Sequence, residues 1–132
     1  MANLTAQRSD KRQDGQLVST ALAAVKVYKG SILNFNTSGY AKPAGDVASE
    51  VFAGVAIETV DNSAGAAGAL NVRVWKEGVV SLNCASATQA WVGQDVYAVD
   101  DNTVALAATT TNDVRVGRVV QFVSATEVRV KL

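Results

Sequence analysis

The sequence contains no histidine, one cysteine and one proline among its 132 residues. Without histidine the chain lacks the commonest general base and the commonest transition-metal ligand, which excludes a histidine-dependent catalytic triad. The single cysteine, Cys84, excludes an intrachain disulfide, fits a reducing compartment and is expected to be a small buried hydrophobic residue. No Gly-rich segment is followed by the Lys-Ser/Thr pair of a phosphate-binding loop. We therefore predict that the protein is not an enzyme and binds no cofactor or metal ion.

The sequence also lacks an excess of charge of either sign and lacks long apolar runs. Lys and Arg together number 12, as do Asp and Glu. A neutral chain creates no overall field that would attract DNA, RNA or an anionic membrane. The apolar stretches are far shorter than the roughly 20 residues that span a bilayer, and no signal peptide is apparent. We expect no nucleic-acid, membrane or small-molecule partner.

Two groups of residues leave narrower alternatives open. Asp95, Asp100 and Asp101 carry the oxygen ligands that calcium prefers, but their spacing matches no EF-hand loop and such acids are common in turns. Aromatic and basic side chains also gather early in the chain, where a barrel could use them to bind an oligonucleotide. They are Lys26, Tyr28, Lys29, Phe35, Tyr40 and Lys42. The zero net charge favours packed aromatic rings and lysines that keep strand edges soluble.

The sequence is rich in short alternating segments separated by turn residues. Hydrophobic residues make up 48% and charged residues 18%, a composition typical of folded chains. Val is frequent, and its β-branched side chain suits a pleated, half-buried surface. We expect about eight or nine short strands, with a helical turn near residues 86–91. The predicted fold is an all-β antiparallel barrel or sandwich without an internal repeat.

Two hairpins are predicted. One joins residues 70–75 to residues 79–82 through Lys76-Glu77-Gly78, and the other joins residues 116–123 to residues 127–132. In the first, Leu70, Val72 and Val74 are expected to face inward and Trp75 outward. A tryptophan on the polar face of a strand is often a contact residue, so Trp75 is a candidate interface residue, as is Trp91 near a turn. The alternative is that a second layer of the same chain covers each ring.

Residues 1–16 differ from residues 17–132, which we expect to form a single domain. The first segment is charged, has few large apolar residues and has no period of a helix or a strand. Extended, this N-terminal arm would reach about 50 Å. It is either a frayed terminus or a segment that becomes ordered on a partner. Its candidate contact residues are Leu4, Arg8, Lys11 and Arg12.

Five segments between residues 24 and 132 carry a resemblance to a known family. They are residues 27–30 (VYKG), 39–44 (GYAKPA), 52–65 (FAGVAIETVDNSAG), 92–101 (VGQDVYAVDD) and 116–120 (VGRVV). In this order they resemble the small β-rich proteins encoded among the head genes of tailed bacteriophages and prophages, some of which are capsid cement, or decoration, proteins. These segments are turn and strand signatures, and the N-terminal arm lies outside them.

The resemblance implies a structural protein of the virion. Such a protein is made in the host cytoplasm, binds the outer capsid surface of the mature head across the seams between major capsid protein subunits, and stabilises the shell. Its partners would be the major capsid protein and further copies of itself, as a trimer or dimer on a local symmetry axis. The alternatives are another virion component, of the tail or the head–tail junction, and a nucleic-acid-binding barrel with salt-dependent affinity.

Overall fold

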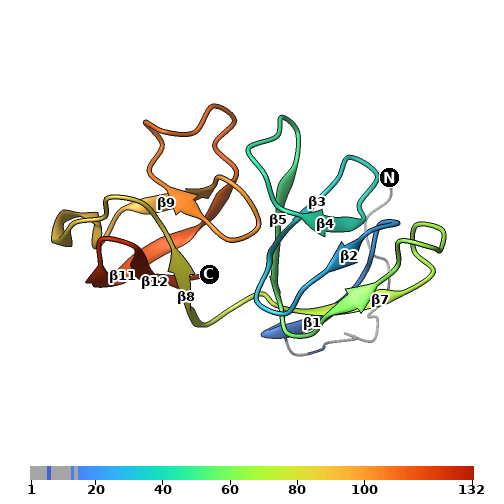
Figure 1. The fold of residues 1–132 in the computed structure, drawn as a ribbon. Coiled ribbons are helices and arrows are strands. Elements are labelled where there is room, and N and C mark those ends of the chain that lie inside the picture. Colours follow the sequence, from blue (N-terminus) through green and yellow to red (C-terminus); the bar gives the residue numbers. More distant parts are fainter. Residues whose placement is uncertain (1–5, 7–12, 14) are drawn as a thin grey trace.

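The structure, a computed structural model, describes Ala6, Gln13 and residues 15–132. Within these residues nearly all regular structure is antiparallel β-sheet, which confirms the predicted all-β fold. The one helical element is a short 3-10 helix, η1 (Gln89–Trp91), at the place where a helical turn was expected. Figure 1 shows the two main sheets as lobes that lie side by side, one coloured blue to green and the other yellow to red.

Each lobe is a five-stranded antiparallel sheet. The first sheet has the order β1-β7-β5-β3-β4, and the second has the order β10-β9-β11-β12-β8. The strands of the first sheet are β1 (Leu17–Ala21), β3 (Ile32–Phe35), β4 (Ala41–Pro43), β5 (Val51–Ala56) and β7 (Asn71–Trp75). The second comprises β8 (Val79–Asn83), β9 (Asp95–Ala98), β10 (Val104–Ala105), β11 (Arg115–Ser124) and β12 (Glu127–Lys131). Two further strands, β2 (Lys26–Val27) and β6 (Val60–Asp61), pair with each other. The strands outnumber our estimate because β2, β6 and β10 have two residues each.

The two sheets have the same topology. When the strands of each sheet are counted along the chain, both follow the order first, fifth, fourth, second, third. Each sheet also curls until a single parallel bridge, Leu22 to Ala41 or Asn83 to Thr103, connects its two edges. The prediction that the chain has no internal repeat is therefore wrong at the level of structure. We call residues 16–76 the first unit and residues 78–132 the second unit.

Matching backbone contacts align the two units residue by residue. Gly30 N–H donates to the carbonyl of Ala56 at 2.8 Å, and Gly93 N–H donates to that of Val119 at 2.9 Å. Lys76 N–H donates to the carbonyl of Gln16 at 2.8 Å, as Leu132 N–H does to that of Gly78 at 2.9 Å. These contacts place Trp75 of β7 at the position that Lys131 occupies in β12.

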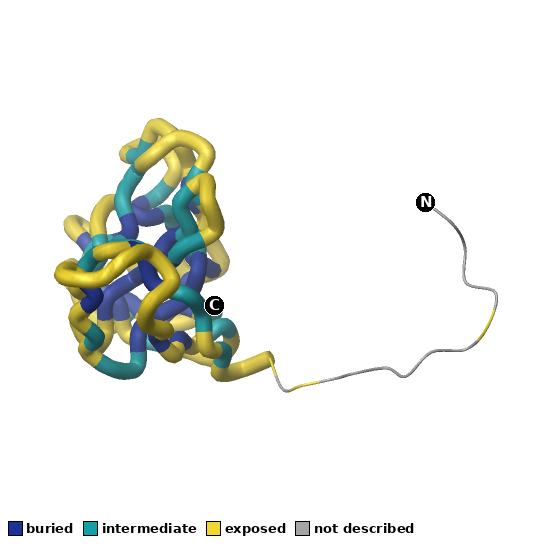
Figure 2. Tube along the Cα trace, turned by 90° about the vertical axis from the view of Figure 1, so that its right-hand side faces the viewer, coloured by how far each residue is buried: buried dark blue, intermediate teal, exposed yellow. Residues whose placement is uncertain are grey.

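Two apolar cores lie inside the molecule, and β3 faces both. Successive strand residues point to opposite faces. Leu33 therefore packs in the core of the first unit, while Ile32 packs among the buried residues of the second. Ala44 and the half-buried Phe52 join Ile32 in this second core. The dark segments in Figure 2 lie in the interior, whereas the exposed segments are mostly loops. The outer face of β3 and β5 is thus the surface on which the second unit packs.

One of the two predicted hairpins does not form. The hairpin of β11 and β12 is confirmed, but β7 pairs with β1 and β5, whereas β8 pairs with β12. Lys76-Glu77-Gly78 carries the chain from one sheet to the other, with Gly78 at a φ of 112°. Leu70 precedes β7 and is 45% exposed, so its expected inward orientation is also wrong. The local alternation was correct for Val72 and Val74, which are fully buried.

Candidate protein-interaction surface

Trp75 lies on the outer face of the first sheet because the alternation of β7 buries Val72 and Val74. Its backbone is paired between Leu17 of β1 and Val55 of β5. Trp75 is 40% exposed and Leu17 is 38% exposed, whereas Val55 is almost fully buried. An apolar row therefore runs from the buried Val55 through the exposed indole ring of Trp75 to the exposed Leu17. Trp75 thus meets the expectation of an exposed aromatic side chain on the polar face.

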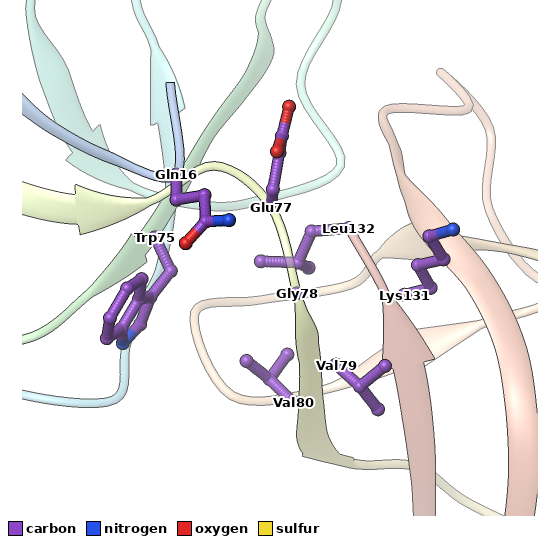
Figure 3. Close-up of a pocket in the computed structure, with 8 residues that line it drawn as sticks. All are labelled: Gln16, Trp75, Glu77, Gly78, Val79, Val80, Lys131 and Leu132. Carbon is purple, nitrogen blue, oxygen red and sulfur yellow. The ribbon is translucent and has the colours of Figure 1, made fainter. Parts of the chain in front are cut away.

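Trp75, within this row, lines a groove between the two sheets. The groove has a volume of about 720 Å³ and is lined by Gln16, Trp75, Glu77, Gly78, Val79, Val80, Lys131 and Leu132. We call it the Trp75 groove. In Figure 3 the indole ring lies across the groove from Val80 and Leu132, while the chain of Glu77 and Gly78 passes above it. Val79 is 55% exposed. A groove with an exposed tryptophan and aliphatic walls has the character of a protein contact site.

The groove is bordered by an unpaired strand edge. Strand β8 is the last strand of its sheet, and within the part of the chain that the structure describes it pairs only with β12 along residues 79–83, apart from the bridge at Asn83. Because Gly78 accepts a hydrogen bond from Leu132, the alternation of an antiparallel ladder directs the N–H and C=O groups of Val79 and Ser81 away from β12. Such an edge can bond to the backbone of an extended segment of another protein.

Charged side chains occupy the equivalent row of the second sheet. Asp95 is paired with Arg118, Arg118 with Lys131, and Lys131 with Val79 of the groove. The Asp95 carboxylate accepts hydrogen bonds from Arg115 at 3.1 Å and from Arg118 at 3.2 Å. The Arg115 guanidinium and, less strongly, that of Arg118 hold the pKa of Asp95 below its usual range. This carboxyl group is therefore ionised at neutral pH and fixes both guanidinium groups.

The remaining candidate residues do not line the groove. Trp91 ends η1, is half-buried and packs against the core of the second unit. Leu4, Arg8, Lys11 and Arg12 lie outside the described residues. The carbonyl of Gln16 accepts a hydrogen bond from Lys76, and β1 begins at Leu17. Val79, Val80 and Leu132 were missed because the predicted hairpin placed β7 beside β8.

The described residues offer little for the alternative chemistries. Nowhere in residues 15–132 do three acidic or thiol groups converge as metal ligands would. Cys84 is buried, and burial raises the pKa of its thiol. Among the basic side chains of residues 26–42, Lys26 lies over the ring of Tyr28 and Lys42 pairs with Glu50. None of the described helices is long and apolar enough to span a membrane.

Comparison of the chain with models of protein families, with curated proteins and with solved structures found no match.

Proposed function

We propose that this protein is a phage capsid decoration protein that binds the outer surface of the mature head across the seams between major capsid protein subunits. The observation that carries the proposal is the Trp75 groove with its apolar row and strand edge, since these features are suited to contact with another protein. The resemblance to small phage head proteins supplies the kind of partner. Binding across seams stabilises a shell because parting two subunits then requires breaking the added contacts as well.

The chemistry of the groove supports tight binding by a small area. Hot spots of protein interfaces are enriched in tryptophan and lie in pockets that exclude water when the partner is bound. An interface of standard size buries about 800 Å² on each partner. A dimer or trimer of the decoration protein would engage several seams at once and gain avidity without new kinds of contact. Analytical ultracentrifugation of the free protein tests this part of the proposal.

The central experiment is co-sedimentation of the purified protein with expanded capsid shells that lack it. The number of bound copies is counted per major capsid protein subunit. Saturation at a fixed ratio supports decoration, and the ratio indicates which symmetry axis is occupied. Binding at a few copies per particle would favour a head–tail component instead. Absence of binding to both compact and expanded shells would overturn the proposal.

A matched pair of variants connects shell binding to the groove. Trp75→Ser removes the exposed indole, and we expect the affinity for shells to fall about tenfold or more. Tyr28→Ser is the control, because Tyr28 is also an exposed aromatic residue, at 57%, and does not line the groove. Its affinity should match that of the wild type. If both variants lost the same affinity for shells, or if neither lost any, the groove would not be the site of shell binding.

A further inference from the structure

Positive charge is concentrated on the outer face of β9, β11 and β12, although the net charge of the chain is zero. Arg115, Arg118, Arg129 and Lys131 project from this face, which we call the basic face, and its acids are Asp95 and Glu127. Residues 15–132 contain nine Lys and Arg and ten Asp and Glu. The other surfaces of the described chain therefore hold five cations and eight acids. The charge of this molecule is thus unevenly distributed.

The basic face and the Trp75 groove form one continuous surface. Lys131 and Leu132 line the groove, and they also line a neighbouring hollow of about 310 Å³ together with Arg115, Arg118 and Val120. Val79, on the wall of the groove, is the cross-strand neighbour of Lys131. A segment that places an apolar side chain beside Trp75 would therefore have its flanking residues next to these cations.

The two arginines are arranged to bind further carboxylates. Each uses one N–H group to hold Asp95, through Arg115 Nη2 and Arg118 Nε. A guanidinium group has five N–H donors, so most remain free, and both side chains are more than half exposed. Because the shared carboxylate restrains both groups, a ligand would lose less conformational freedom in binding them. Planar guanidinium groups match the two oxygens of a carboxylate.

Comparison of the units indicates that this position is an interface. The residues of the first unit that are equivalent to Asp95, Arg115 and Arg118 are Ile32, Phe52 and Val55. Ile32 and Phe52 pack against the core of the second unit. The same place on the second unit has no covering element within the described residues, and its apolar residues are replaced by charged ones. A partner that binds this position of the second unit should therefore present charged groups rather than apolar ones.

We propose that the Trp75 groove and the basic face together bind an acidic protein segment. An apolar side chain of the segment enters the groove, and carboxylates beside it pair with Arg115, Arg118 and Lys131. This inference rests on the proposed function only in assigning the segment to the major capsid protein. A nucleic acid fits less well, because the acids on the rest of the described surface and Glu77 in the groove repel a long polyanion, whereas Trp75, Val79, Val80 and Leu132 offer apolar contacts in the groove.

The direct test uses synthetic peptides and NMR, without shells. The probes are Glu-Glu-Leu-Glu-Glu and its Gln-Gln-Leu-Gln-Gln and Lys-Lys-Leu-Lys-Lys analogues, each with blocked termini. The acidic peptide should shift the indole N–H signal of Trp75 and the Nε–H signals of Arg115 and Arg118, and the basic peptide should not. Equal binding of all three peptides, or tighter binding of a short single-stranded DNA, would overturn the inference.

Variants then carry the test to the shells. The double variant Arg115→Gln, Arg118→Gln should bind the acidic peptide and the shells about threefold to tenfold more weakly, and the wild-type affinity should fall with added salt. Arg73→Gln is the matched control, because Arg73 is an exposed arginine paired with Glu58 on the first sheet. Shell binding that is unaffected by salt and by the double variant would refute the acidic segment and leave decoration intact. Peptide binding without any shell binding would refute decoration and leave the acidic segment.

Discussion

Gly54 and Gly117 occupy equivalent positions, and each allows two strands to approach closely. A Cβ atom on Gly54 would lie 2.7 Å from the carbonyl oxygen of Trp75, and one on Gly117 would collide with that of Lys131. Gly54 also has a φ of 147°, which L side chains rarely adopt. A glycine inside a strand is typical of a bend or a close backbone approach, and here it is a close backbone contact that holds Trp75 in place at the edge of the groove.

At this scale, Gly54→Ala should lower the free energy of unfolding by about 2–5 kcal/mol, since backbone strain and overpacking add. Gly39→Ala is the control, because Gly39 has a φ of 85° and nothing within 4 Å of the added methyl. It should cost only about 1–2 kcal/mol. Urea denaturation measures both. Similar losses in the two variants would show that crowding against Trp75 contributes nothing.

Among the elements, the loops that follow β4 and β10 lie in equivalent places and bind each other. The Asp46 carboxylate accepts hydrogen bonds at 2.7 Å from the backbone N–H groups of Thr111 and Asn112. The N–H group of Thr111, followed by that of Asn112, holds the pKa of Asp46 below its usual range. One carboxylate thus connects the first unit to the second.

This contact predicts a specific dependence on pH. Because the pKa of Asp46 is lower in the folded chain, its stabilisation is complete above the unfolded value of about 3.9 and is lost as the pH falls through the folded value. Asp46→Asn should lower the thermal midpoint by a few degrees at neutral pH, and the difference from wild type should shrink below about pH 4. Asp101→Asn, which removes the same charge from a nearby turn, is the control. A difference that is constant from neutral to acidic pH would contradict this assignment.

How much of these elements is predictable from the sequence depends on the range of the signal. Alternation and turn residues identified β7, β8, β11 and β12, and the exposure of Trp75, because these features are local. The partner of β7 was mispredicted because a short connection can join neighbouring strands or cross between sheets, and nothing in Lys76-Glu77-Gly78 distinguishes the two. The Trp75 groove forms because this connection crosses from one sheet to the other. The wall made by Val79, Val80 and Leu132 could therefore not be predicted.

The repeat was also hidden from the sequence, for a reason that concerns the whole molecule. Val72-Arg73-Val74 and Val128-Arg129-Val130 are identical, but few other equivalent residues are. The connection before β7, residues 57–70, is much longer than the turn before β12. Topology survives such changes because the backbone pairing and a few glycines define it, while the outward residues diverge.

The shared second core predicts that the two units unfold together. Trp75 reports on the first unit and Trp91 on the second, so the variants Trp91→Phe and Trp75→Phe give one fluorescence probe each. Ile32→Ala should cost about 2–5 kcal/mol and shift both probes equally. Val27→Ala, confined to the core of the first unit, is the comparison and should also shift both probes. Separate transitions for the two probes would show that the units are independent.

The N-terminal arm gives a prediction about the intact particle. Deleting residues 1–14 retains Gln16, whose carbonyl pairs with Lys76. If the proposed function holds and the arm takes part in attachment, the thermal midpoint should remain unchanged while binding to shells becomes weaker. A variant in which Arg8, Lys11 and Arg12 are replaced by Gln tests whether charge is responsible. Loss of the folded state on deletion would assign the arm a structural role instead.

The charged residues on the outer face of the second unit also affect whether a further unit can pack there, as the second unit packs on the first. If a unit has an apolar face on one side and, on the other side, a core that is not covered, the face of one copy can cover the core of the next. Such head-to-tail packing can continue without limit. The core of the first unit is uncovered on one side, where Val51 is 59% exposed, whereas its equivalent in the second unit, Val114, is buried. Asp95, Arg115 and Arg118 remove the matching apolar face from the second unit. A second copy of the chain therefore cannot continue the row of units at this face through the apolar contact that joins the first unit to the second.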